Sequence, residues 1–348
     1  MTNKRYLREL DGLRATAILL VLISHVWSVE ATVHIGYLGV SVFFVLSGYL
    51  ITSISLAEEM NKGRISLVGF YVRRAFRIFP LYYLVLGIYC LLILGLNLFP
   101  EKHLPLKEVL PFYLFYLQEI PFFRERPFYQ SWSLGIEEKF YLVWPLICFA
   151  GLRYAKAWRI PTAAMLAVAC SLSWYMRPYA CILFGCVLAL SLQIESARKL
   201  VERSAAIGIW ISAAILLGFH LGSIQFWKWE FAVTLYALAF AFFLGFLVVG
   251  ESYFKKTLGA APLAFIGKMS YGIYLVHLLC LAVLRPKIPI HNTWLMLSAT
   301  LALSLVVATV LHYVLEQPFI RFGRQFSKKI TGPESAPLLA SVDSSSQA

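Results

Sequence analysis

Arg14 and His25 are the two residues whose types and positions most clearly suggest chemistry. Both lie in the first long apolar stretch of the chain, where ionisable groups are costly and are therefore candidates for function. In a helix, about 100° and 1.5 Å per residue would place them on one face, ~16 Å apart along the axis. An imidazole can act as a general base near neutral pH. The alternative is structural: His25 is a hydrogen-bonded histidine, and Arg14 is an interfacial anchor paired with Asp11.

Three arginines form the second group, in the segment FYVRRAFRIFP at residues 70–80. Arg73 and Arg77 are four residues apart, and Arg74 lies three before Arg77, so a helix would present them as one basic cluster. Guanidinium groups match the oxygens of phosphate, which makes the cluster a candidate phosphate clamp. An ordinary excess of positive charge on the cytoplasmic side of a membrane explains the same residues equally well.

Acidic and aromatic residues form the third group, in QSWSLGIEEKFYLVWPL at residues 130–146. Glu137 lies in the aromatic-rich opening of an apolar stretch, where a carboxylate could orient an imidazole or accept a hydrogen bond from a sugar hydroxyl. Glu138 and Lys139 can be explained as solvated charges. In IGKMSYGIYLVHL, residues 266–278, we expect the polar side chains to form hydrogen bonds inside a helix bundle. They are Ser270, Tyr271, Tyr274 and His277.

The composition indicates which elements must position these residues. Of the 348 residues, 60% are apolar and 14% are charged, whereas soluble domains have roughly 45–50% and 25%. The mean hydropathy is +0.72. These values exclude a soluble enzyme, a fibrous protein and a disordered chain, and they predict an all-α, polytopic membrane helix bundle. The net charge of +13 then fits basic cytoplasmic loops, and we expect no nucleic-acid partner.

Apolar stretches near the length of a membrane-spanning helix, about 20 residues, occur along most of the chain. In order they are 13–31, 35–57, 78–99, 106–123, 132–152, 160–176, 178–195, 204–222, 229–249, 262–284 and 292–315. The fourth is the weakest, because it is short, bounded by prolines and carries Glu119. The first has no small-residue cleavage pattern, so we expect a retained span and not a removed signal peptide.

The distribution of Lys and Arg argues against the fourth stretch as a span. If 106–123 does not cross, 20 of these side chains are cytoplasmic and 9 are external. If it does cross, the counts become 15 and 14, and the positive-inside bias of helical membrane proteins disappears. We therefore predict about ten spans, with both termini cytoplasmic. Residues 100–131 become an outer-face segment that can dip into the membrane.

A single membrane domain is expected at residues 1–325, followed by a polar, disordered cytoplasmic tail at 326–348. The six cysteines all lie in apolar stretches, and none forms a CxxC motif, so we expect buried thiols and no disulfides. Zinc-ligand spacing and a glycine-rich phosphate loop are both missing from the sequence. We therefore expect no metal and no permanently bound cofactor.

Six sequence blocks in order resemble the acyltransferase-3 family of integral membrane acyltransferases, over roughly residues 6–322. The blocks are LDGLRATAILLVLISH (10–25), GVSVFFVLSGYLIT (39–52), RRAFRIFPLYYL (73–84), QSWSLGIEEKFYLVWPL (130–146), IGKMSYGIYLVHL (266–278) and LEQPF (315–319). Arg14 and His25 match the family's essential pair, and Glu137 matches its WSLxxE glutamate. The family's inner-face basic motif falls on Arg73, Arg74 and Arg77.

The resemblance implies an O-acyltransferase of the bacterial plasma membrane. Such proteins move an acyl group, usually acetyl, from an acyl-CoA to a hydroxyl of an extracytoplasmic or lipid-linked carbohydrate. Many members also carry a fused extracytoplasmic esterase-like domain. This chain ends about 30 residues after its last expected span, so we expect the membrane domain to bind the acceptor alone or to pass the acyl group to a partner.

The helix geometry agrees with this implied activity. An acyl-CoA has an anionic nucleotide and an arm on the order of 15–20 Å long, comparable to the ~16 Å rise between Arg14 and His25. The nucleotide would be held at the cytoplasmic mouth by the basic cluster and Arg14. His25 would act as general base on the acceptor hydroxyl, and Glu137 would orient the imidazole or the sugar.

Two other classes of membrane protein remain as alternatives. Arg14 and His25 could line the polar path of a multi-span transporter or flippase, although such proteins usually show two related halves and the sequence shows no matching half. A lipid-linked glycosyltransferase would need acidic residues in the first outer loop, which offers only Glu30.

Overall fold

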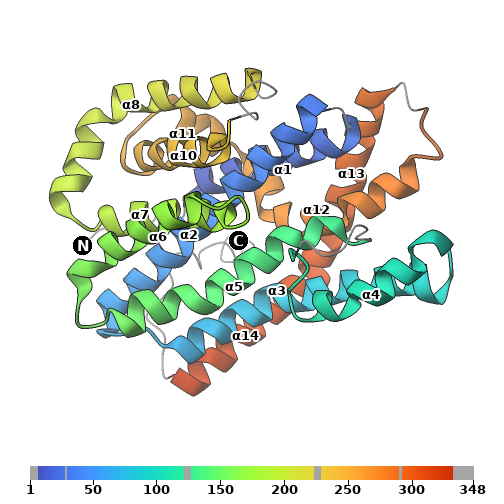
Figure 1. The fold of residues 1–348 in the computed structure, drawn as a ribbon, viewed down its shortest axis with the longest axis horizontal. Coiled ribbons are helices and arrows are strands. Elements are labelled where there is room, and N and C mark those ends of the chain that lie inside the picture. The colour runs from blue at the N-terminus through green and yellow to red at the C-terminus, as the bar shows by residue number, and fades with distance from the viewer. Residues whose placement is uncertain (1–6, 28–29, 121–126, 223–228, 290–291, 332–348) are drawn as a thin grey trace, which may run out of the picture. The chain divides into compact units, whose positions relative to one another are not determined.

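The computed structural model describes residues 7–27, 30–120, 127–222, 229–289 and 292–331. Every regular element within these ranges is helical (Figure 1), so the predicted all-α fold is confirmed. The chain divides into two compact units. The first contains the described residues of Met1–Ile65 and Ile147–Ser270, and the second those of Ser66–Leu146 and Tyr271–Pro333.

The first unit is built from six long helices. They are α1 (Arg8–Trp27), α2 (Glu30–Lys62), α6 (Arg159–Ser171), α7 (Arg177–Ser191), α8 (Glu195–Leu221) and α10 (Ala232–Val249). A 3-10 turn at Lys156–Trp158 precedes α6, and the short helix α11 (Tyr253–Leu258) follows α10. Helix α12 (Ala261–Leu284) begins in this unit and ends in the second.

The second unit contains five further α-helices, three of which continue into π-helical segments. Helix α3 (Leu67–Cys90) continues as the π-helical Leu91–Gly95, and α13 (Thr293–Leu311) continues through the π-helical His312–Glu316 into α14 (Gln317–Thr331). Helix α4 (His103–Leu114) follows a 3-10 turn at Pro100–Lys102. Helix α5 (Trp132–Pro145) follows a second turn at Tyr129–Ser131 and continues as the π-helical Leu146–Gly151, most of which belongs to the first unit.

Glycines bring helices of the first unit into backbone contact. Gly48 of α2 lies against the carbonyl of Ile182 on α7, and Gly185 of α7 lies against the carbonyl of Val45 and the amide nitrogen of Tyr49 on α2. A Cβ atom at either glycine would overlap these groups. Small residues at helix crossings are typical of membrane proteins, where close packing must replace the hydrophobic effect between helices.

A buried ion pair joins the end of α2 to the start of α6. Arg159 donates from both terminal nitrogens to Glu59, at 2.6 Å and 2.9 Å, and the Arg159 residue is 3% exposed. The guanidinium also lies over the ring of Phe149, 4.9 Å from its centroid. Such a bidentate pair fixes both helix ends, because breaking it would leave an uncompensated buried charge.

In the second unit, α14 packs against the first half of α3 through aromatic rings. Phe76 of α3 contacts the rings of Phe319, Phe322 and Phe326, with centroids 5.3–6.4 Å away. Gly323 faces Phe76 at the centre of this contact. This packing explains why residues up to Thr331 are helical, although the sequence predicts a disordered tail from 326. The rest of that tail, residues 332–348, lies outside the described residues.

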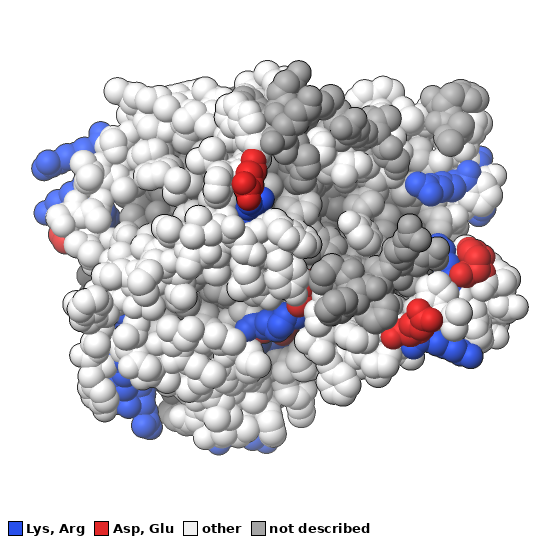
Figure 2. All heavy atoms as spheres, in the orientation of Figure 1, with Lys and Arg blue, Asp and Glu red and all other residues white. Residues whose placement is uncertain are grey.

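Large apolar side chains are exposed along the long helices. On α8 they are Ile207, Trp210, Ile211, Ile215 and Leu217. On the face drawn in Figure 2, the charged side chains of the described residues occur in a few small groups. Soluble proteins rarely expose so much apolar surface, whereas helices that face lipid tails require it.

Seven helical runs among the described residues are long and apolar enough to cross a membrane. They are Arg8–Trp27, Thr32–Lys62, Leu67–Gly95, Glu195–Leu221, Ala232–Val249, Ala261–Leu284 and Thr293–Thr331. The polytopic membrane class is thus confirmed. The expected spans 132–152, 160–176 and 178–195 correspond to α5, α6 and α7, whose α-helical parts have 14, 13 and 15 residues. Ten spans therefore stays a prediction.

Candidate active site

Helix α1 holds Arg14 and His25, as predicted from their spacing. Glycines on both sides fix the first turns of this helix, because Gly12 lies against the carbonyl of Leu258 in α11 and Gly267 of α12 lies against the carbonyl of Asp11. The two candidate residues therefore project from a helix whose backbone is tightly enclosed at the end that carries Arg14.

Arg14 is paired with the residue one turn before it. Its terminal nitrogen donates to Asp11 Oδ1 at 2.8 Å, and the Asp11 side chain is 5% exposed whereas that of Arg14 is 24% exposed. The structural alternative from the sequence is thus observed. A guanidinium has five N–H groups, so this ion pair orients Arg14 without using all its donors.

The ring of His25 is oriented by the backbone of its own helix. His25 Nδ1 lies 2.9 Å from the carbonyl oxygen of Val21 and 3.4 Å from Ser24 Oγ. A carbonyl can only accept, so the neutral imidazole carries its proton on Nδ1, and Nε2 keeps the lone pair. A general base needs this arrangement, with one nitrogen anchored and the other basic.

Glu137 lies on α5 in the second unit, where it accepts a hydrogen bond from a tyrosine one turn later. The Tyr141 hydroxyl donates to Glu137 Oε2 at 2.7 Å, and Tyr141 is 5% exposed. A residue of α3 fixes the position of this turn, because the Tyr71 hydroxyl donates to the carbonyl of Leu142 at 2.8 Å. Glu137 is therefore held by a buried donor of fixed position.

The neighbouring charges Glu138 and Lys139 are not solvated in the way the sequence suggests. Lys139 Nζ lies 2.6 Å from Glu119 Oε1, whose side chain is buried, and it also donates to the carbonyl of Tyr116. Within the described part of the chain, the buried Glu138 Oε1 has no hydrogen-bond partner. Residues 115–120, which follow α4, therefore contact this face of α5 through Tyr116 and Glu119.

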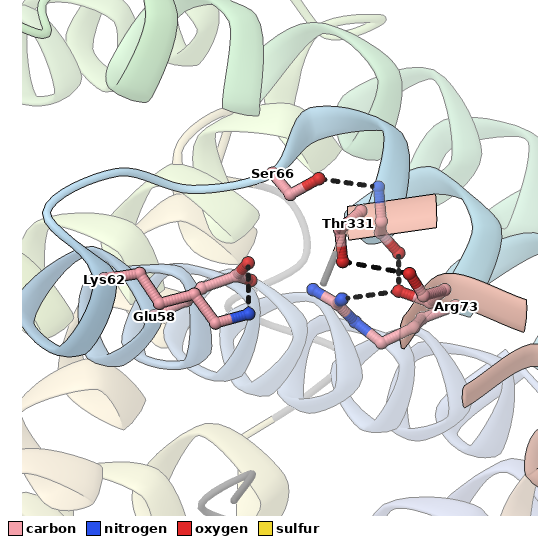
Figure 3. Close-up of polar contacts among 7 residues, drawn as sticks. Glu58, Lys62, Ser66, Arg73 and Thr331 are labelled. Carbon is pink, nitrogen blue, oxygen red and sulfur yellow. Dashed lines mark hydrogen bonds and ion pairs between the residues drawn. The ribbon is translucent and has the colours of Figure 1, made fainter. Parts of the chain in front are cut away.

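The three arginines of the basic motif have three different surroundings. Arg73 donates to Ser327 Oγ of α14 at 3.0 Å, in a network that also links Ser66, Gly69 and Thr331 (Figure 3). Arg74 lies over the ring of Tyr141 on α5. Arg77 is exposed. One helix presents the three side chains as expected, but they do not converge on one point.

The structure thus brings some predicted residues together and leaves others in separate units. Arg14 and His25 share α1 in the first unit, whereas Glu137 and the three arginines belong to the second. Arg74 and Glu137 are joined through Tyr141, although the sequence places them at opposite ends of neighbouring spans. Nothing local in the sequence identifies Tyr141, because its contact with α3 is long-range.

Helix α12 confirms the prediction of hydrogen bonds inside the bundle. The Tyr271 hydroxyl donates to the carbonyl of Ile78 at 2.9 Å. The hydroxyls of Tyr274 and Ser133 are 2.7 Å apart, and His277 Nδ1 lies 2.7 Å from the carbonyl of Tyr274. Among the described residues, no group of three His, Cys, Asp or Glu side chains could hold a metal ion.

Comparison with known proteins decides the family. The model of a family described as an acyltransferase domain matches residues 7–313. The chain belongs to the acyltransferase-3 family. No solved structure matches the chain significantly.

Curated relatives of this acyltransferase-3 protein are O-acetyltransferases. The chain is 32% identical to the O-acetyltransferase OatA of Staphylococcus aureus over 311 residues, which cover 80% of this chain and 51% of OatA. It is 27% identical to the peptidoglycan O-acetyltransferase OatA of Listeria monocytogenes over 372 residues, which cover 94% of this chain and 58% of the relative. The chain thus spans about half the length of the curated relatives it matches.

Proposed function

We propose that this protein is a membrane O-acyltransferase that moves an acetyl group from cytoplasmic acetyl-CoA to a hydroxyl of an extracytoplasmic or lipid-linked carbohydrate. The proposal places it in the plasma membrane of a bacterium. Because one relative acts on peptidoglycan, a cell-wall glycan is the first acceptor to examine. The observation that carries the proposal is the anchored His25 ring, whose Nδ1 is bonded to Val21 and whose Nε2 is therefore basic.

The reaction requires two proton transfers and one acyl transfer. His25 Nε2 takes the proton of the acceptor hydroxyl while the hydroxyl oxygen attacks the carbonyl carbon of the thioester. The carbon–sulfur bond breaks, the new ester forms, and the His25 imidazolium gives its proton to the thiolate of CoA, which leaves as the thiol. Glu137 contributes by accepting a hydrogen bond from the carbohydrate.

Donor binding is assigned to basic residues near the cytoplasmic side. Arg77 is exposed, and Arg73 and Arg14 are partly exposed. Charged hydrogen bonds from these side chains suit the phosphates of the nucleotide. The ~16 Å between Arg14 and His25 along α1 is comparable to the length of the acyl-CoA arm.

The membrane topology proposed for this reaction has ten spans and both termini cytoplasmic. Helix α4 has 12 residues, ~18 Å, which is shorter than the ~30 Å hydrocarbon core. The Tyr82 hydroxyl of α3 donates to the carbonyl of Tyr113, ~20 Å along the axis from the end of the helical run at Gly95. Both observations support a segment 100–131 that enters the membrane and returns to the same side.

A comparison of surface glycans tests the function directly. Cell-wall and surface glycans from bacteria with and without the gene are digested and measured by mass spectrometry. We expect a mass increase of one acetyl group on a defined sugar only in cells that make the protein, with loss of that increase in a His25→Ala strain. Identical glycans in all three strains would contradict the proposal.

A further inference from the structure

Arg74 differs from the two other arginines of its motif in what it faces. Its guanidinium carbon lies 4.8 Å from the centroid of the Tyr141 ring and 5.8 Å from that of Phe70. Cations over aromatic faces are attracted by the ring's quadrupole, and the attraction increases when both groups are desolvated. Arg74 therefore packs against α5, whereas its neighbour Arg73 contacts α14.

The far end of the same tyrosine ring contacts Glu137. Tyr141 receives Arg74 on its face and donates its hydroxyl proton to Glu137 Oε2 at 2.7 Å. A cation over a phenol ring withdraws electron density, which makes the hydroxyl a stronger donor. The chain Arg74–Tyr141–Glu137 thus transmits the effect of a positive charge on α3 to a carboxylate on α5.

A second carboxylate makes the positive charge more important. Glu138 is the next residue on α5, and its buried Oε1 has no hydrogen-bond partner among the described residues. The positive charge of Arg74 acts on this carboxylate as well. Two adjacent carboxylates in a poorly solvated site repel each other. Arg74 therefore offsets the repulsion at the turn that carries Glu137.

We propose that Arg74 and Tyr141 are positioning residues for Glu137 and that Arg74 is not a ligand of the donor phosphates. This inference rests on the proposed function, and it gives Arg74 a role in binding the carbohydrate acceptor, through Glu137, and not in binding the donor. The donor phosphates are left to Arg73, Arg77 and Arg14. The basic motif then serves two tasks, because consecutive positions of one helix face different neighbours.

Steady-state kinetics separate the two tasks. In Arg74→Gln we expect kcat to fall on the order of 10–100-fold, as for a misplaced group, while KM for acetyl-CoA changes little. Arg74→Lys should recover part of the rate, because it restores the charge without the planar stacking. The matched control Arg77→Gln should instead raise KM for acetyl-CoA. A raised KM with unchanged kcat in Arg74→Gln would overturn the proposal.

Tyr141→Phe tests the link without removing the ring. The variant keeps the packing and the surface under Arg74 but loses the donor to Glu137, so kcat should fall while thermal stability stays near that of the wild type. The double variant Arg74→Gln with Tyr141→Phe should be little worse than either single variant, because both act through one path. A folded Tyr141→Phe protein with full activity would overturn the proposal.

Chemical labelling gives a readout that does not depend on activity. N,N′-dicyclohexylcarbodiimide reacts with protonated carboxyl groups in apolar surroundings, and peptide mass spectrometry locates the adduct. Glu137 should be protected in the wild type and in Arg77→Gln, but labelled in Arg74→Gln and Tyr141→Phe. If the wild-type protein transfers no acetyl group, the proposed function fails, and this labelling pattern still decides the positioning role. Equal labelling in all four proteins would contradict it.

Discussion

At the residue scale, the hydrogen bond from His25 to the Val21 carbonyl gives this histidine both a structural and a chemical property. The bond satisfies one ring nitrogen inside an apolar helix, and it determines which nitrogen keeps the lone pair. The two properties involve different ring nitrogens, so the structural hydrogen bond of His25 is compatible with its action as a general base. Substitution must therefore separate hydrogen bonding from proton transfer.

His25→Gln makes that separation. A glutamine amide can still donate to a carbonyl, but it cannot take a proton, so acetyl transfer should fall by ~10²-fold or more. The protein should remain inserted, because hydrogen bonds between membrane helices contribute on average ~0.6 kcal/mol. Transfer is measured in proteoliposomes with acetyl-CoA and a soluble glycan.

The same exchange at a second histidine is the control. His220 of α8 lies 3.2 Å from the Tyr236 hydroxyl through Nε2, and His220→Gln should transfer acetyl groups at close to the wild-type rate. Near-normal transfer by His25→Gln would remove the base assignment.

Arg77 and Arg73 should respond differently to truncation. Arg77 is exposed, so Arg77→Ala should raise KM for acetyl-CoA through a lost charged hydrogen bond of ~1.5–3 kcal/mol, with an unchanged Tm. Arg73→Ala should also lower Tm, because the buried Ser327 loses its donor. Kinetics and thermal unfolding of both variants check this, and an unchanged KM in both would reject the phosphate clamp.

At the element scale, the segment after α4 is attached to α5 by a glycine and an ion pair. A Cβ atom at Gly135 would lie 2.6 Å from Glu119 Oε2 and 2.9 Å from the carbonyl oxygen of Tyr116. Tyr116 itself has a φ of 57°, a left-handed conformation that is costly for a residue with a side chain. The turn is therefore maintained by its contacts with α5.

A charge exchange tests this attachment. Glu119→Lys should lower the free energy of unfolding by about 1.5–3 kcal/mol, because Lys139 then faces a like charge. Glu119→Lys combined with Lys139→Glu should restore much of the loss, since the pair re-forms with its charges reversed. Tm values in one detergent measure both effects. A double variant no more stable than the single one would show that the pair does not hold the segment.

Several elements follow from sequence alone, and others depend on contacts that sequence does not show. The hydropathy of 35–57 and 262–284 predicts α2 and most of α12, because these stretches are long and nearly uncharged. The apolar stretch 132–152 predicts one span. In the structure the α-helix ends at Pro145, which has no N–H for the bond to the preceding turn, and a π-helical segment follows.

The candidate site shows the same division. The positions of Arg14 and His25 on one helix follow from periodicity, since both belong to a single uninterrupted run. The distinct surroundings of Arg73, Arg74 and Arg77 do not, because Ser327 and Tyr141 come from distant parts of the chain. Sequence spacing predicts which face of a helix a residue occupies, but tertiary packing decides which residues contact that face.

At the scale of the whole molecule, the proposed topology determines which groups share a compartment. Reporter fusions test it. A reporter after Pro127 should be extracytoplasmic, and reporters after Lys156 and Thr331 should be cytoplasmic, as the distribution of Lys and Arg requires. Alkaline phosphatase and fluorescent-protein activities give the readout. A cytoplasmic result at Pro127 would mean that 106–123 crosses the membrane.

The buried pair of Glu59 and Arg159 has a consequence for biogenesis. The two residues are 100 positions apart, and translation adds about 5–20 residues per second. Glu59 is thus synthesised several seconds before Arg159. During that interval its carboxylate must stay at the hydrated surface of the bilayer or be shielded by an insertion chaperone. Helix α2 consequently reaches its final position late in synthesis. Nascent chains arrested before Arg159 should be degraded rapidly by membrane quality-control proteases.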